Sequence, residues 1–262
     1  KTGLPDACPI VPLGKLDKTC YYLDASGQLV GLTDRDHREL CIMGLFGAEN
    51  HKLRECWPKY NKDHELVGWD VKDAAENLLR ASAQAGLWRP FERVRGVGAW
   101  ASADGGLILH CGDAVIVDGV SQKPGKVGRH VYPADEPVAK PAPDAATVEV
   151  GQWLLRLLSS WRWQRPDMDP ILLLGWIAAA RIGGALKWRP LTWITGGSGT
   201  GKSTLHDVLK MLFGDGGLVD VAEPTPAGIW QKLKYRTVPV AIDESEAEDD
   251  NRKVLSVVKM AR

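Results

Sequence analysis

The stretch "WITGGSGTGKSTL" (193–205) governs how the rest of the chain is interpreted. It matches the pattern G-x-x-x-x-G-K-[ST], in which a glycine-rich turn holds phosphate. Residues 191–195 just before the turn are β-branched and aromatic, which is typical of a buried strand, and residues 203–214 predict a helix. Strand, glycine loop and helix in this order indicate a nucleotide-binding site.

The residue types in this loop suit phosphate chemistry. Glycines let the backbone N–H groups turn inward, and the following helix N-terminus adds positive potential. We expect Lys202 to reach the β- and γ-phosphates of ATP and Ser203 to bind Mg²⁺. The expected nucleotide contacts are Gly196, Gly197, Ser198, Gly199, Thr200, Gly201, Lys202, Ser203 and Thr204.

A second motif, "TVPVAIDES" (237–245), predicts an apolar strand that ends in two acids. We expect Asp243 to hold the metal, and Glu244 to orient or deprotonate the water that attacks the γ-phosphate. Lys202 and Glu244 are therefore the expected catalytic residues. The alternative is a strand that runs into a solvated acidic loop, since "DESEAEDD" (243–250) holds six acids in eight positions.

If water attacks the γ-phosphate, the reaction is hydrolysis rather than transfer of the phosphoryl group to another molecule. A small-molecule kinase needs an acceptor site and lid arginines, and a GTPase needs an N-K-x-D stretch, neither of which is evident. Between Lys202 and Asp243 there is room for a helix (203–213), a strand (218–222) and a second helix (225–234). Asp243 is thus expected to end the third strand of a compact α/β unit.

The proline-rich stretch 132–146 predicts a linker. It separates an expected α+β accessory domain (1–131) from an expected ATPase core (147–262). Before it we expect hairpins over 20–32 and 98–117 and helices over 36–47 and 69–86, the last capped by Asp70 and ended by Gly86. After it we expect an amphipathic helix over 150–161 and a core helix over 171–186 with Asp169 as its cap.

Composition narrows the class of protein. Lys+Arg and Asp+Glu both number 33 in 262 residues, which argues against a passive basic coat for nucleic acid. The five cysteines form no CxxC pair, and we expect reduced thiols in a cytoplasmic protein rather than a zinc site. The apolar run 171–186 contains Arg181 and is shorter than the roughly 20 residues of a membrane span, so we expect a buried helix and no membrane association.

The C-terminal half resembles the AAA+ class of P-loop ATPases, and within it the superfamily 3 helicases and primase-helicases of phages and mobile genetic elements. The matching residues are "GGSGTGKST" (196–204), "VAIDE" (240–244) and the expected helix "NRKVLSVVKMAR" (251–262). The stretch 172–205, in which a helical segment precedes the loop, also looks like this group. The resemblance covers about 147–262, and residues 1–131 match no motif.

The resemblance implies an α/β P-loop NTPase fold, AAA+-like with a parallel sheet, preceded by a smaller α+β domain. It also implies an ATP- and Mg²⁺-dependent DNA helicase or translocase of replication that acts on single-stranded or forked DNA as a homo-oligomer, a hexameric ring. The sequence ends at Arg262, before a sensor asparagine or arginine finger, so we expect this core to be incomplete. Two alternatives stay open: a non-helicase AAA+ ATPase (a loader, initiator or packaging-type motor), or a DNA- or partner-binding module on an ATPase scaffold.

Overall fold

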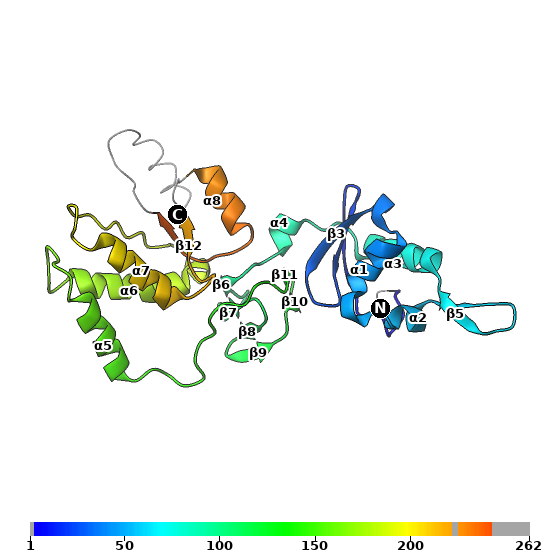
Figure 1. The fold of residues 1–262 in the computed structure, drawn as a ribbon, viewed down its shortest axis with the longest axis horizontal. Helices are drawn as coiled ribbons and strands as arrows, with labels where there is room; N and C mark the ends of the chain where they lie inside the picture. The colour runs from blue at the N-terminus through cyan, green and yellow to red at the C-terminus, as the bar shows by residue number, and fades with distance from the viewer. Residues whose placement is uncertain (1–2, 222–224, 243–262) are drawn as a thin grey trace. The chain divides into compact units, whose positions relative to one another are not determined.

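The computed structural model describes residues 3–221 and 225–242 (Figure 1). The chain forms two compact units. Unit 1 comprises Lys1–Arg95 and Pro124–Asp135, and unit 2 comprises Gly96–Lys123 and Glu136–Arg262. The chain therefore passes from the first unit to the second, returns, and crosses again within the proline-rich stretch.

This division differs from the single linker boundary expected from the sequence. The stretch after residue 135 is held by unit 2, because the amide of Val138 donates to the carbonyl of Cys111 at 3.0 Å. The Lys140 ammonium also pairs with Asp113 at 2.6 Å. The structure has neither helix nor strand between Tyr132 and Val148, as the prolines predict.

Unit 1 combines small antiparallel sheets with short helices. A three-stranded sheet has the order β1–β2–β3, and two hairpins, β4–β5 and β10–β11, accompany it. Its strands are β1 (Val11–Leu16), β2 (Thr19–Leu23), β3 (Leu29–Thr33), β4 (Pro58–Tyr60), β5 (Leu66–Trp69), β10 (Gly125–Val127) and β11 (His130–Tyr132). Its helices are α1 (Glu39–Phe46), α2 (Lys52–Cys56), α3 (Val71–Ala85) and α4 (Pro90–Arg93), with 3₁₀ turns at Asp34–Asp36 and Gly47–Glu49.

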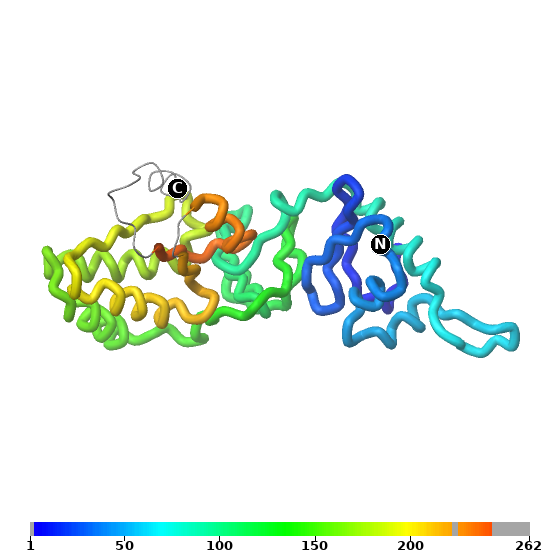
Figure 2. Tube along the Cα trace, turned by 45° about the horizontal axis from the view of Figure 1, so that its top comes forward, coloured from blue at the N-terminus to red at the C-terminus, as the bar shows by residue number. Residues whose placement is uncertain are grey.

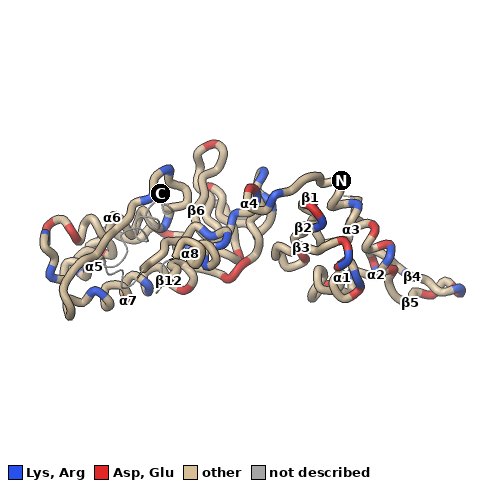
Figure 3. The backbone as a smooth tube through the Cα atoms, turned by 90° about the horizontal axis from the view of Figure 1, so that it is seen from above, with Lys and Arg blue, Asp and Glu red and all other residues tan. Residues whose placement is uncertain are grey.

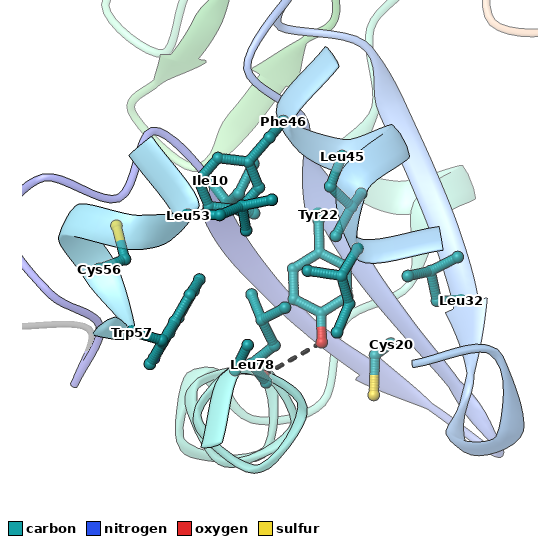
Figure 4. Close-up of a cluster of buried hydrophobic side chains, with 12 residues drawn as sticks. Ile10, Cys20, Tyr22, Leu32, Leu45, Phe46, Leu53, Cys56, Trp57 and Leu78 are labelled. Carbon is teal, nitrogen blue, oxygen red and sulfur yellow. Dashed lines mark hydrogen bonds between the residues drawn. The ribbon is translucent and has the colours of Figure 1, made fainter. Parts of the chain in front are cut away.

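The core of unit 1 lies between the β1–β2–β3 sheet and helices α1 to α3 (Figure 4). Tyr22 is completely buried, and its hydroxyl lies 3.1 Å from the carbonyl oxygen of Leu78 in α3 and 2.9 Å from Nε2 of His37. The completely buried members of this core are Cys20, Tyr22, Ile42, Phe46, Ala74 and Leu78. A polar contact at the centre thus fixes α3 against the sheet.

Helix α3 confirms the sequence prediction for this segment. The Asp70 carboxylate accepts hydrogen bonds from the amides of Lys72 and Asp73, which are unpaired donors of the first turn. Gly86 ends the helix with a φ of +85°. The buried Ser82 hydroxyl donates to the carbonyl of Gly14 at 2.8 Å and fixes the end of α3 on β1.

Unit 2 contains a four-stranded antiparallel sheet and a helical part. The sheet is the meander β6 (Gly98–Ala101), β7 (Leu107–His110), β8 (Val115–Val117) and β9 (Val120–Gln122). The later elements are α5 (Val148–Leu158), α6 (Asp169–Arg181), a 3₁₀ turn (Gly183–Ala185), α7 (Lys202–Phe213), β12 (Val219–Val221), α8 (Pro226–Leu233) and β13 (Val240–Ile242). Strands β12 and β13, which precede and follow α8 in the chain, pair in parallel.

Helices α5, α6 and α7 share one apolar core. Its buried members are Leu158, Leu173, Ile177, Leu205, Leu209 and Phe213. Figure 2 shows α6 and α7 running beside each other in this part of the chain. Arg181 at the end of α6 lies over the ring of Phe213, 4.8 Å from its centroid. The buried face of α7 fixes the position of its N-terminus, where the glycine loop ends.

The fold class expected from the sequence, an α/β P-loop NTPase with an AAA+-like parallel sheet after a smaller α+β domain, is wrong. Among the described residues four sheets are antiparallel, and the parallel sheet consists of β12 and β13 alone. Residues 191–195 form no strand, because no described strand pairs with them. Leu191 and Trp193 are 57% and 51% exposed, so this stretch is not the buried strand that its composition suggests.

The start of α6 also differs from the prediction. Asp169 is the first helical residue rather than the cap, and Pro170 follows it. The Asp169 carboxylate instead accepts from the amide of Arg165 at 3.0 Å and pairs with the guanidinium of Arg165 at 2.7 Å. The carboxylate is therefore held by the preceding loop.

Candidate phosphate-binding loop

The glycine loop runs directly into helix α7. The helix begins at Lys202, and Gly201 caps it with a φ of +84°. Gly199 has a φ of +73°. L-residues with a side chain rarely adopt these left-handed values, so glycine is needed at both positions. The loop pattern read from the sequence is therefore matched by a backbone that glycine alone adopts easily.

Lys202 folds back over the loop. Its ammonium donates to the carbonyl oxygens of Gly196 at 2.6 Å and Gly197 at 2.9 Å. The hydroxyl of Thr200 donates to the same Gly197 carbonyl at 2.9 Å. The charge of Lys202 is thus held at the centre of the turn by neutral oxygens, and no described carboxylate pairs with it.

The first turn of α7 adds to the positive potential. Ser203 and Thr204 are exposed there, and the turn contains no acidic residue. The first amides of a helix have no partner inside the helix and carry partial positive charge. A cationic side chain, free helical amides and the absence of an acid in that turn together suit an anion such as a phosphate group.

Trp161, at the end of the apolar stripe expected over 150–161, anchors the loop. Its indole Nε1 donates to the carbonyl of Gly201 at 3.0 Å. A Cβ at Gly201 would lie 2.9 Å from that nitrogen, so a side chain there would push the indole away. The ring is also packed against the core of α5 to α7. The sequence contains eleven tryptophans, and no local pattern singles out Trp161 as the anchor.

Helix α7 is also connected to β12. Asp220 pairs with the ammonium of Lys210 and lies 3.8 Å from Nε2 of His206. The hydrogen bond from Lys210 lowers the pKa of Asp220 below its usual value, so this carboxylate is ionised and engaged. The Lys210–Asp220 ion pair therefore connects α7 to β12.

The two acids of the second motif, Asp243 and Glu244, lie outside the described residues. Strand β13 is described to Ile242, which pairs with Val221 of β12. Of the expected metal-binding pair, Ser203 alone is described, at the second position of α7. Within residues 3–221 and 225–242 no group of three His, Cys, Asp or Glu side chains is arranged to hold a metal.

The comparisons with known proteins add no relative. No protein-family model matches the chain, and no curated protein or solved structure matches it. No helix in the described part of the chain has the length and apolar content needed to cross a bilayer.

Proposed function

We propose that this chain binds ATP through Gly196–Thr204 and hydrolyses it. The observation that carries the proposal is the ammonium of Lys202, held 2.6 Å and 2.9 Å from the carbonyls of Gly196 and Gly197 at the N-terminus of α7. This local geometry supports phosphate binding whatever sheet lies behind the loop. Charge-assisted hydrogen bonds from a lysine and from helical amides are strong phosphate contacts.

Each part of the loop has a role in this proposal. The Lys202 ammonium exchanges its contacts with two neutral carbonyls for contacts with charged phosphate oxygens. In this proposal the exposed hydroxyl of Ser203 would bind Mg²⁺, with Asp243 as the second protein ligand assigned by the sequence. Mg²⁺ supplies neutralisation of negative charge on the phosphates. Glu244, assigned by the sequence, orients the attacking water.

We further propose that hydrolysis drives a helicase or translocase on DNA, with several copies of the chain acting as a ring. The order of the two motifs and their likeness to superfamily 3 helicases support this assignment. A ring would let a neighbouring copy contribute to each site. A loader, initiator or packaging-type ATPase uses the same chemistry without unwinding DNA, and measurements on DNA distinguish these functions.

The binding step is tested by titrating Mg²⁺-ATP into wild-type protein and Lys202→Ala. Removing a charged hydrogen-bond donor costs about 1.5–3 kcal/mol, so we expect affinity to fall roughly 10- to 100-fold. Lys187→Ala, which removes an exposed lysine of the same unit outside the loop, is the matched control and keeps wild-type affinity. Equal affinity of Lys202→Ala and wild type would show that the loop is not the nucleotide site.

The motor assignment is tested by measuring ATPase rates with and without single-stranded and forked DNA. We expect DNA to raise the rate and forked DNA to be unwound. Stimulation without strand separation favours a loader, initiator or packaging motor. Hydrolysis at a rate that neither DNA nor RNA changes contradicts a motor on nucleic acid.

A further inference from the structure

A cationic cavity lies in unit 1, in a part of the chain that the phosphate loop does not use. Its volume is about 520 Å³, within the range typical of ligand sites. Strand β1, the end of α3, helix α4 and the β10–β11 hairpin all contribute to its wall. Its lining includes Leu13, Ala85, Trp88, Arg93, Lys126 and Arg129. No Asp or Glu is among the described residues that line it.

Backbone hydrogen bonds hold the segment that carries one wall of this cavity. After α3 the chain bridges to β1, where the amide of Trp88 donates to the carbonyl of Lys15 at 3.0 Å. At the other end of the segment the amide of Arg95 donates to the carbonyl of Val131 in β11 at 2.9 Å. The Trp88 ring also packs against Tyr21, with centroids 5.0 Å apart. Helix α4 is therefore fixed at both ends.

The positive charges around the cavity are not neutralised by acids within residues 3–221 and 225–242. No carboxylate in that part of the chain forms an ion pair with Arg93, Lys126 or Arg129. Figure 3 shows both basic and acidic segments at helix α4, whose acid Glu92 pairs with Arg89 at 3.0 Å. Because the whole chain has a net charge of zero, this local excess of positive charge is a feature of the fold rather than of composition.

The pKa of His130 is affected by the same positive charges. Burial and the positive charges of Arg95, Arg129 and Arg93 lower its pKa to about 4. The imidazole is therefore neutral at neutral pH. The like charges are held near one another by the backbone pairing of β11, an arrangement that an anionic ligand would stabilise.

Apolar surface accompanies these charges. Phe91 of α4 is 89% exposed, and Leu87 is 69% exposed. Proteins that bind single strands combine a positively charged groove for the backbone with exposed aromatic rings on which bases stack. A free phosphate ion would use the charges but not the aromatic ring. The bases of a duplex are already stacked on each other and cannot stack on Phe91. The combination therefore favours a single strand.

We propose that this cavity and Phe91 bind single-stranded nucleic acid, with Arg93, Lys126 and Arg129 contacting phosphates and Phe91 stacking on a base. This binding site is separate from the ATP loop and does not require hydrolysis. Nucleic acid held here would keep a single strand attached to the chain independently of the nucleotide state.

The test measures binding of the full chain to a labelled oligothymidine of about 20 nucleotides, a length that exceeds a typical single-strand site. Fluorescence anisotropy is recorded between about 50 and 200 mM salt. Removing one phosphate contact reduces the slope of log K against log salt by about 0.7 and the affinity about fivefold near 0.1 M salt. Lys126→Ala/Arg129→Ala is therefore expected to bind about 25-fold more weakly and with a slope smaller by about 1.4.

Matched variants separate charge from stacking. Lys62→Ala removes an exposed lysine of the same unit, between β4 and β5, and is expected to bind like wild type. Phe91→Ala is expected to lose about fivefold or more in affinity with an unchanged salt slope, because stacking releases no counterions. Arg93 is half-buried, so it is replaced by glutamine rather than alanine. Arg93→Gln removes the charge but keeps a side chain that can form hydrogen bonds. Thermal melting of each variant confirms that it is folded.

Four results would overturn this inference. The first is no binding to oligothymidine at about 50 mM salt, where phosphate contacts are strongest. The second is wild-type affinity and slope in Lys126→Ala/Arg129→Ala. The third is displacement of the oligonucleotide by inorganic phosphate at an equal phosphate concentration, which would identify a small-anion site. Lys202→Ala is expected to keep full oligonucleotide binding, and loss of binding in that variant would place the strand at the loop instead.

Discussion

The indole nitrogen of Trp161 donates to the carbonyl of Gly201 at 3.0 Å, which joins the segment after α5 to the residue that caps α7. Gly201 has a left-handed backbone, and the space where its Cβ would lie is taken up by this indole. The glycine loop is thus positioned by a side chain 40 residues earlier in the sequence.

Replacing Trp161 with phenylalanine tests this anchor. The variant keeps an aromatic ring but loses the hydrogen bond, so we expect stability to fall by about 1 kcal/mol and ATP affinity to fall several-fold. Trp163→Phe is the control, because its Nε1 donates to the Leu158 carbonyl at 2.7 Å, away from the loop. It is expected to lose similar stability but no ATP affinity. Calorimetric titration and urea unfolding measure both, and equal ATP affinity in the two variants contradicts the anchoring role.

Three glycine-to-alanine variants rank the strain in the loop. In Gly201→Ala the new side chain would have a left-handed φ and would press against the Trp161 indole, so we expect stability to fall by roughly 2 kcal/mol or more. Gly199 has a left-handed φ, but no atom lies where its Cβ would be, so we expect Gly199→Ala to lower stability by about 1 kcal/mol. Gly197→Ala has neither constraint and is expected to be near wild type. Urea unfolding gives the order, and a Gly197→Ala that is the least stable of the three would refute it.

Tyr22→Phe tests the polar contact in the core of unit 1. The hydroxyl is completely buried and lies near the Leu78 carbonyl and His37. Removing it leaves buried polar groups without this partner, and we expect a loss of about 1–3 kcal/mol. Tyr60→Phe, on an exposed strand of the same unit, is expected to change stability little. Hydrogen exchange of β2 and α3 measures the effect, which would be absent if the hydroxyl contributed nothing.

His37 makes the stability of unit 1 depend on pH. Burial lowers the pKa of His37 below its ordinary value of about 6.5, so the folded state holds it neutral. The unfolded state then binds the proton more readily, and stability is complete above about pH 6.5 and is lost as the pH falls toward the folded pKa. In His37→Gln we expect stability to fall less as the pH is lowered from about 6.5. Hydrogen exchange of unit 1 at several pH values tests this, and an unchanged pH dependence contradicts it.

Local structure in this protein was largely predictable from residue pattern. The cap at Asp70, the end of α3 at Gly86 and the helix after the glycine loop follow from short-range rules that depend on a few neighbouring residues. The glycine loop expected at Gly196–Ser203 contains two left-handed glycines, Gly199 and Gly201. The strand expected over 191–195 was wrong, because a strand requires a pairing partner that its own residues do not specify.

The sequence by itself determined the glycine loop, its lysine and the helix that follows, since these depend on φ values and hydrogen bonds between residues close in the chain. Only the tertiary structure decided that Trp161 holds the loop, that antiparallel sheets dominate the described fold, and that Arg93, Lys126 and Arg129 gather around one cavity. These features join segments far apart in sequence. Their formation depends on long-range pairing and packing, which no local pattern encodes.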